Sequence, residues 1–200
     1  MTPTNRPPRV ATVQRATSET KIALTLALDG SGAARVATGV GFLDHMLTSL
    51  AHHAGFDLDL ACEGDLRVDD HHTVEDCALA MGEAIDRALG DRRGIRRFGF
   101  AYAPLDEALA RSVVDLATRP TTVIDLGLTR ERLGDLSCEN APHFFGSLAT
   151  AGRFCLHVDV LRGVNDHHRL EAAFKATALA LRQGVGLEGS AGARSTKGVL

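Results

Sequence analysis

His71-His72-Thr73-Val74-Glu75 is repeated 96 residues later as His167-His168-Arg169-Leu170-Glu171. Each copy is followed by an apolar pattern of helical period, and each is preceded by another histidine, His45 and His143, which are 98 residues apart. A repeat near half the length of a 200-residue chain predicts two copies of one folding unit. Two copies of this pattern also indicate two metal ions that are held by both halves.

The spacing within each copy suits metal ligands on a helix. Residues four apart lie on one face, so the first histidine and the glutamate of each copy can hold one ion. The second histidine points about 100° away around the helix and is free to reach another ion. If the halves face each other across a pseudo-two-fold axis, we expect two sites of three imidazoles and one carboxylate, which leave open positions on an octahedral ion. The expected sets are His71, Glu75, His143 and His168, and His167, Glu171, His45 and His72.

Composition narrows the class of protein. A hydrophobic content of 44% allows a proper core, and a formal net charge of −3 gives no reason to expect nucleic acid or an anionic membrane as partner. No apolar run is long enough to cross a bilayer, and residues 1–8 are expected to form a loose, disordered tail and not a secretion signal. Cys62, Cys77, Cys138 and Cys155 form no Cys-x-x-Cys pair, which predicts reduced residues of a cytoplasmic protein.

Alternating apolar residues predict strands in both halves. We expect residues 33–38 to be the hairpin partner of the first strand across the Asp29-Gly30 turn. The predicted strands cover residues 20–29, 33–38 and 56–62 in the first half, and 108–117, 121–128 and 154–160 in the second.

Helical periodicity predicts two helices in each half. Residues 43–54 and 141–152 form the first of each pair, and the second carries the histidine doublet. Asp70 or Thr73 is expected to cap the longer helix of the first half, and Gly90 to end it. Gly39-Val40-Gly41 lacks the third glycine of a dinucleotide-binding loop, so we interpret it as a tight turn that aims His45.

These elements predict an α/β (α+β) protein made by internal duplication of a β-β-β-α-β-α half-domain, in which two amphipathic helices cover one apolar face of a sheet. The first half is expected at residues 9–94 and the second at residues 95–200. Without a flexible linker between them, the halves are expected to pack as one body.

Four blocks of sequence together resemble a known family. The set is similar to the imidazoleglycerol-phosphate dehydratases of histidine biosynthesis, in their monofunctional form, from Arg15 onward. Leu43 stands where the family usually has an aromatic residue and Arg194 where proline is common, and neither is a candidate ligand. The blocks are residues 39–47, 69–76, 165–176 and 195–200.

The resemblance implies a fold like domain 2 of ribosomal protein S5, with two mixed four-stranded sheets and the helices packed between them. It implies two Mn²⁺ ions per active site, active sites shared between subunits, and a homo-oligomer in which trimers assemble into a 24-mer. The implied metal ligands are His45, His71, His72, Glu75, His143, His167, His168 and Glu171.

The resemblance also implies roles for residues that would otherwise pass as surface charges. Glu19, expected in a strand, is implied as an acid/base group, with His72 and Glu171 as further catalytic residues. A guanidinium fork and a lysine suit a phosphate dianion. The implied substrate contacts are His53, Arg97, Arg119, Lys175, Ser195, Thr196 and Lys197.

Four aspartates lie beside the candidate ligands in the sequence. We expect these aspartates to orient the ligand imidazoles by hydrogen bonds to the ring nitrogens that do not bind metal. They are Asp44, Asp70, Asp76 and Asp166. His52 and His157 have no repeat counterpart and are interpreted as ordinary surface residues.

The implied reaction is the dehydration of D-erythro-imidazole glycerol phosphate to imidazole acetol phosphate, a hydro-lyase step of L-histidine biosynthesis. Ions on both ring nitrogens would convert the substrate ring to an imidazolate that expels the adjacent hydroxyl. The resulting diazafulvene-like intermediate has an acidic C–H, which Glu19 can deprotonate.

Two other hypotheses remain open. A dinuclear metallohydrolase acting on a phosphoester would not explain two sites that are each rich in imidazole. A non-catalytic metal-storage or assembly protein would not explain Arg97, Arg119 and the terminal Ser-Thr-Lys block.

Overall fold

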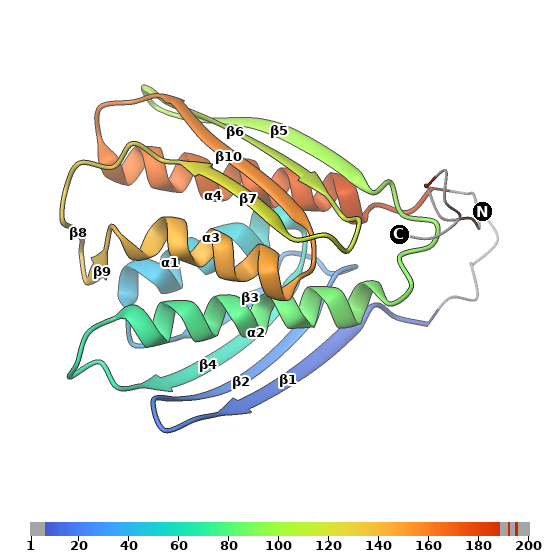
Figure 1. Ribbon diagram of the computed structural model, residues 1–200, viewed down its shortest axis with the longest axis horizontal. Coiled ribbons are helices and arrows are strands. Elements are labelled where there is room, and N and C mark those ends of the chain that lie inside the picture. The colour runs from blue at the N-terminus through green and yellow to red at the C-terminus, as the bar shows by residue number, and fades with distance from the viewer. Residues whose placement is uncertain (1–6, 189–191, 193–194, 196–200) are drawn as a thin grey trace.

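The computed structural model describes residues 7–188, 192 and 195. Two four-stranded sheets enclose a layer of helices (Figure 1). The first sheet has the order β1-β2-β4-β3 and consists of β1 (Val10–Ala16), β2 (Thr20–Ala27), β3 (Ala34–Ala37) and β4 (Asp57–Gly64). The second has the order β5-β6-β10-β7 and consists of β5 (Phe98–Leu105), β6 (Ala108–Asp115), β7 (Thr121–Asp125) and β10 (Cys155–Arg162).

Both sheets are mixed in the same way. Only the pairs β3–β4 and β7–β10 are parallel, and the other neighbours are antiparallel. Both sheets have the same strand order. In each sheet, the first, second, fourth and third strands along the chain lie side by side in that order. The predicted fold class, two mixed four-stranded sheets with helices between them, is confirmed.

The helix layer joins the two halves. It consists of α1 (Gly41–Ala54), α2 (His71–Leu89), α3 (Asn140–Ala151) and α4 (Asp166–Val185). Helix α1 packs against α4, and α2 packs against α3, so each pair takes one helix from either half. The helices bury large apolar residues on their inner faces, including Met81 on α2 and Phe174 on α4. No helix in the described part of the chain is long and apolar enough to span a membrane.

The prediction that residues 33–38 pair with residues 20–29 is wrong. Both edges of β2 are occupied by β1 and β4, and β3 lies parallel to β4 instead. The chain crosses the end of the sheet before β3, where Asp57 Oδ1 accepts hydrogen bonds from the backbone N–H groups of Ser31 (2.8 Å) and Ala33 (3.0 Å). A Cβ atom on Gly30 would lie 2.4 Å from the backbone nitrogen of Asp57, so only glycine fits this crossing.

Strand β5 was not located from the sequence because its pattern is inverted. Phe98, Phe100 and Tyr102 point to the outside of the sheet and are more than half exposed. The alternate positions face α4 and are small. A Cβ atom on Gly99 would lie 1.9 Å from the carbonyl oxygen of Ala180, so this position must be glycine for α4 to approach so closely.

A segment of residues 126–139, here called the bridging segment, separates β7 from α3. It contains a short hairpin of β8 (Arg132–Leu133) and β9 (Leu136–Ser137). At the equivalent place in the first half, only residues 38–40 lie between β3 and α1. The duplication is therefore unequal at this point.

The bridging segment fixes the starts of three helices. Asp135 accepts hydrogen bonds from the backbone N–H groups of Gly41 (2.6 Å) and Phe42 (3.0 Å) at the start of α1. Asp70, before α2, accepts from the backbone N–H of Ser137 (2.7 Å), and Asp166, the first residue of α4, accepts from that of Arg130 (2.7 Å). These helix starts carry the histidines of interest.

Candidate metal centres

Two clusters of two imidazoles and one carboxylate lie near the helix starts. Figure 1 shows that the helices that carry them begin at one end of the molecule. In each cluster, the candidate ligand atoms lie within 4.8 Å of one another. Each cluster takes residues from a helix of either half. The α2–α3 cluster consists of His71, Glu75 and His143, and the α4–α1 cluster of His167, Glu171 and His45.

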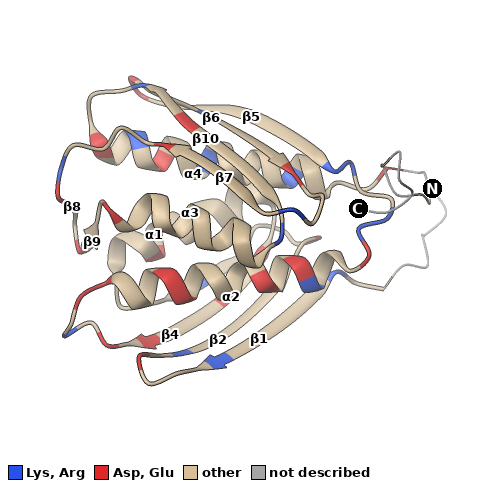
Figure 2. Ribbon diagram, in the orientation of Figure 1, with Lys and Arg blue, Asp and Glu red and all other residues tan. Residues whose placement is uncertain are grey.

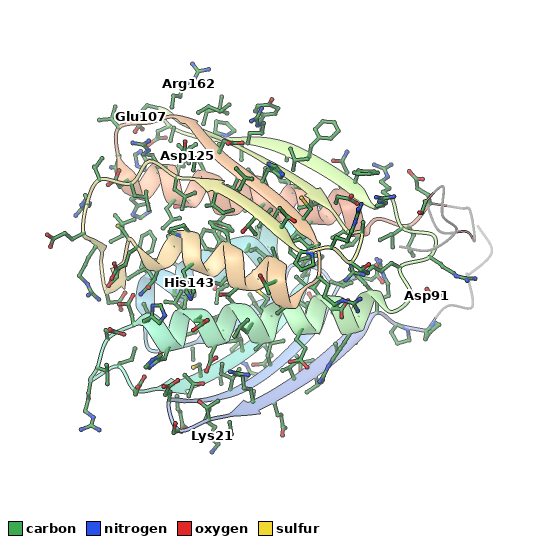
Figure 3. The ribbon with its side chains drawn as sticks, viewed as in Figure 1. Lys21, Asp91, Glu107, Asp125, His143 and Arg162 are labelled. Carbon is green, nitrogen blue, oxygen red and sulfur yellow. The ribbon has the colours of Figure 1, made fainter. Side chains whose placement is uncertain are left out.

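In the α2–α3 cluster, Glu75 lies between two imidazoles. Its Oε2 is 3.8 Å from His71 Nε2, and its Oε1 is 3.4 Å from His143 Nε2. The two rings stack with centroids 4.8 Å apart. The Nε2 atom of His143, a residue labelled in Figure 3, is shielded from solvent and has no hydrogen-bond partner in the described part of the chain. An orphaned ring nitrogen beside a carboxylate fits a metal ligand.

In the α4–α1 cluster, a lysine joins the carboxylate. Glu171 Oε2 is 3.1 Å from His167 Nε2 and 3.3 Å from His45 Nε2, while Glu171 Oε1 is 2.8 Å from Lys175 Nζ. Burial raises the pKa of Glu171, but Lys175 and the two histidines outweigh it and the net pKa is lowered. His53 on α1 lies nearby, and its pKa is lowered by burial and then by the charge of Lys175.

His72 and His168 join neither cluster within the chain. His72 Nδ1 lies 3.0 Å from Asp65 Oδ2, and His168 Nδ1 lies 2.8 Å from Glu107 Oε2. These hydrogen bonds raise the pKa of both histidines. The structure thus brings together three residues of each expected four-residue set and places the fourth elsewhere.

Glu19 lies in the turn between β1 and β2, so its expected place in a strand is wrong. The turn is tight because Thr17 Oγ1 accepts hydrogen bonds from the backbone N–H groups of Glu19 (3.1 Å) and Thr20 (3.0 Å). The side chain reaches the doublet of α2, where Glu19 Oε1 is 3.5 Å from His72 Nε2. The candidate acid/base group and a candidate ligand are therefore neighbours.

The four aspartates expected to orient imidazoles hold the backbone and other side chains instead. They sit at or near helix starts, where their carboxylates meet N–H and O–H groups of adjoining loops and strands. Asp44 accepts from Thr38, Asp70 from Ser137, Asp76 from Arg15 and Thr20, and Asp166 from Thr129 and Arg130.

Three residues that sequence reasoning missed hold imidazole Nδ1 atoms. Asp65 and Glu107 hold His72 and His168, and Asn140 Oδ1 lies 3.0 Å from His71 Nδ1. Asn140 also hydrogen-bonds Asp70, which therefore acts on His71 only through Asn140. Glu107 and Asn140 are 61 and 69 residues from their histidines, so no local spacing could have revealed them.

Arg97 lies at the opposite end of the molecule from the clusters. Its backbone N–H donates to the carbonyl oxygen of Gly184 (3.0 Å) near the end of α4. Gly184 is 17 residues beyond His167 on the same helix, which is roughly 26 Å at the helical rise. The guanidinium donates to both oxygens of Asp115, at 2.7 and 3.0 Å, and this pair raises the pKa of Arg97.

The remaining expected substrate contacts are spread over the chain. Arg119 is exposed between β6 and β7, at the same end as Arg97, where the loops carry several basic residues (Figure 2). Ser195 is half-buried, and Thr196 and Lys197 lie outside the described residues. His52 and His157 are exposed.

Comparison of the sequence with known proteins points to a single family, because the matching family model and the most similar proteins carry the same name. The family model described as imidazoleglycerol-phosphate dehydratase matches residues 38–181. A Kluyveromyces lactis protein is 52% identical over 217 residues, covering 97% of this chain and 98% of its own length. A Phytophthora nicotianae protein is 58% identical over 192 residues, and this chain covers 42% of its length. Both are named imidazoleglycerol-phosphate dehydratase.

Solved structures agree with the sequence comparison. Imidazoleglycerol-phosphate dehydratase from Staphylococcus aureus has a TM-score of 0.81 at 34% identity, covering 89% of this chain and 99% of its own. The Pyrococcus furiosus protein, solved in complex with (S)-C348, has a TM-score of 0.81 at 34% identity, covering 94% of this chain and 100% of its own. This chain therefore belongs to the imidazoleglycerol-phosphate dehydratase family, the hydro-lyases of histidine biosynthesis.

Proposed function

We propose that this chain dehydrates D-erythro-imidazole glycerol phosphate to imidazole acetol phosphate in L-histidine biosynthesis, with two Mn²⁺ ions per active site. The observation that carries the proposal is the pair of clusters, each with two imidazole nitrogens and one carboxylate. The orphaned Nε2 of His143 supports a metal at the α2–α3 cluster. We also propose a cytoplasmic location, which the four unpaired cysteines support.

The two ions would be held by the two clusters. Each would take a third imidazole from another copy of the chain, His168 for the α2–α3 cluster and His72 for the α4–α1 cluster. When bound, the ions polarise the substrate imidazole through its ring nitrogens and so favour loss of the hydroxyl from the adjacent carbon.

The proton chemistry falls to Glu19. Its carboxylate, 3.5 Å from His72 Nε2, accepts the proton from the carbon next to the one that loses its hydroxyl. The elements of water leave, and the remaining enol tautomerises to the ketone. We assign His72 and Glu171 to catalysis as well, because they would hold the ring against Glu19 while the proton moves.

The position of Arg97 supports an active site shared between copies. We propose that the substrate phosphate contacts Arg97, Arg119, Lys175, Ser195, Thr196 and Lys197, and that His53 contacts the substrate near Lys175. The backbone of Arg97 is hydrogen-bonded to Gly184, which is roughly 26 Å along α4 from His167, and three carbons between ring and phosphate cannot span that distance. The arginines of one copy would therefore complete the clusters of another.

The outer face of the second sheet supports assembly into a homo-oligomer, which we propose is a 24-mer built from trimers. Strand register places Phe100, Val113, His157 and Val123 in one row across its four strands. Phe100 is 63% exposed and Val123 is 47% exposed in the isolated chain. An exposed row in which three of the four residues are apolar is typical of a protein interface.

The hydrolase hypothesis meets an obstacle in the structure. Two-metal hydrolysis uses ions roughly 3.5–4 Å apart, and such ions commonly share a ligand. The two clusters here share no residue and use different helix pairs. The dehydratase proposal needs no shared ligand.

Turnover assays test the proposal. The Mn²⁺-loaded protein should convert imidazole glycerol phosphate to imidazole acetol phosphate without releasing phosphate, and should leave p-nitrophenyl phosphate intact. Phosphate release from p-nitrophenyl phosphate would support the hydrolase instead, and inactivity on both substrates would support the storage hypothesis.

Light scattering tests the shared site. Removing metal with a chelator at neutral pH should shrink the particle, and Mn²⁺ should restore it, because each ion would link copies. One unchanged mass with and without chelator would contradict the linkage.

A further inference from the structure

The two carboxylates that hold His72 and His168 come from positions that are not equivalent in the two halves. Asp65 follows β4 directly, whereas Glu107 lies in the turn before β6 (Figure 3). The residue that directly precedes β2, and so corresponds to Glu107, is Glu19. The duplication alone therefore does not account for the same hydrogen bond in both halves, and each half builds it from a different loop.

Glu107 is held in place on both sides. Its Oε1 accepts hydrogen bonds from the backbone N–H groups of Val164 (2.9 Å) and Asn165 (2.8 Å), just before α4. This leaves Oε2 for His168 Nδ1 at 2.8 Å. The arrangement is built from four hydrogen-bonding groups and joins the β5–β6 turn to the start of α4.

The pairing decides which nitrogen of each ring is available. A carboxylate can only accept, so Nδ1 must carry the proton and Nε2 keeps its lone pair when the imidazole is neutral. A second carboxylate lies near that Nε2 in each half, Glu19 Oε1 at 3.5 Å from His72 and Asp106 Oδ2 at 3.7 Å from His168. Each Nε2 thus faces a negatively charged neighbour, which would also attract a cation.

We propose that Glu107 and Asp65 are positioning residues that fix the ring orientation and tautomer of His168 and His72, so that each presents Nε2 to an ion held by the cluster of another copy. The proposal rests on the proposed function, because it assumes that both histidines are metal ligands. It assigns a role to two residues that would act on the ions through His72 and His168.

Glu107→Gln is the sharpest test because it keeps the shape of the side chain. The amide oxygen can still accept from Val164 and Asn165, but the amide nitrogen then faces His168 and favours the tautomer whose Nε2 carries a proton. We expect Mn²⁺ affinity, measured by titration calorimetry on the assembled protein, to fall by about 10–100-fold for one ion per chain. Asp65→Asn should weaken the other ion by a similar factor.

A matched control removes a carboxylate that contacts no histidine. Within the described residues, Glu83 pairs only with Arg87 on the exposed side of α2, so Glu83→Gln should bind Mn²⁺ as the wild type does. Thermal unfolding of the metal-free variants separates positioning from folding. The positioning role requires that metal-free E107Q and D65N unfold within a few degrees of the wild type while their Mn²⁺ affinity is lowered.

Double variants identify which ion each residue serves. Glu107 should couple to Glu75, because His168 is assigned to the α2–α3 cluster, and Asp65 should couple to Glu171. The effect of E107Q on Mn²⁺ affinity should therefore disappear in an E75Q background and persist in an E171Q background.

The outcomes divide cleanly. Wild-type Mn²⁺ affinity in both E107Q and D65N would overturn the positioning role, as would equal losses of affinity and metal-free stability. If E107Q does not assemble, D65N decides alone, since His72 is the only side-chain partner of Asp65 among the residues that the structure describes. Failure of the wild type to bind Mn²⁺ would instead overturn the proposed function, and with it this inference.

Discussion

The two histidine clusters have the same donor groups, two imidazoles and one carboxylate, but different charge. Glu75 and Glu171 occupy equivalent positions in their helices, yet in the described part of the chain only Glu171 pairs with a lysine, Lys175, at 2.8 Å. Four residues after Glu75, the first half has Leu79. The side chain of Glu171 is 12% exposed and that of Glu75 is 35% exposed. Duplication set the positions of the donors, and a single residue made the two clusters electrostatically unequal.

This inequality has a consequence for an ion. A divalent cation entering the α4–α1 cluster meets a carboxylate that is already neutralised, whereas Glu75 has no such partner in the described part of the chain. We expect the α2–α3 cluster to bind its ion more tightly. The substrate imidazole is itself unsymmetrical, so unequal ions would give it one preferred orientation.

The largest effect is expected from removing either cluster carboxylate. Glu75→Gln and Glu171→Gln should each lose about one ion per chain and lower kcat by at least roughly a thousandfold, since a catalytic ion contributes several kcal/mol. Metal analysis and steady-state kinetics measure both quantities. Retention of both ions by either variant would contradict the assignment of that cluster.

A smaller but still large effect is expected at Glu19. Glu19→Gln should lower kcat by at least about a hundredfold, the usual range for a general acid/base, with near-normal metal content. The comparison with Glu107 is direct, because the two residues occupy the same turn in the two halves. Replacing Glu19 should lower kcat and leave the metal content near normal, whereas replacing Glu107 should lower Mn²⁺ affinity. Normal turnover by E19Q would remove its acid/base assignment.

Exchanging the residue beside each carboxylate should invert the inequality. Lys175→Met should strengthen Mn²⁺ binding at the α4–α1 cluster by about tenfold, as expected for roughly 1.4 kcal/mol of repulsion after solvent screening. Leu79→Lys should weaken the α2–α3 cluster by a similar factor. Titration calorimetry of both variants tests the comparison, and unchanged affinities would show that charge does not distinguish the clusters. K175M should also raise KM if Lys175 contacts substrate.

The smallest effect is expected at the bridging segment, in acid. Burial raises the pKa of Asp135, but the backbone N–H groups of Phe42 and Gly41 outweigh it and the net pKa lies below 3.8. A carboxyl group whose pKa is lowered on folding stabilises the folded state at pH values above 3.8, its unfolded-state pKa. This stabilisation is lost as the pH falls through the pKa of the folded state. Asp135→Asn should lower the metal-free protein's stability by about 1 kcal/mol at pH 6, with a smaller difference near pH 3. Urea unfolding at both pH values checks this, and an equal difference would contradict it.

Much of the fold was readable because pattern and structure agree. The helices follow apolar positions of helical period, and the repeated strand order follows from the repeated sequence. Strand β5 could not be predicted because its large residues face outward and Gly99 faces inward. In this strand the exposed residues are the large ones and the inward-facing residues are small. The position of β3 beside β4 could not be predicted either. It depends on the hydrogen bonds of Asp57 and on the occupation of both edges of β2, and the alternation of apolar and polar residues within one strand carries no information about either.

The same division applies to the candidate site. The histidine and glutamate four residues apart in each cluster followed from helix spacing, because both lie on one face of one helix. The third residue, His143 or His45, lies on another helix and followed from the repeat offset. The anchors Asp65, Asn140 and Glu107 required the tertiary structure, because their contacts join loops to helix starts. The expected fourth histidine of each cluster lies away from it in the single chain, so its role depends on the arrangement of copies.

The bridging segment bears on how such a chain can arise and be redesigned. It exists in only one half, yet it holds the starts of helices from both. A protein made by fusing two first halves would have the strands and helices for both sheets, but nothing equivalent to Asp135 or Ser137 to hold the starts of its helices. Gene duplication is thus enough for the architecture, whereas the alignment of the histidines requires an addition that symmetry cannot supply.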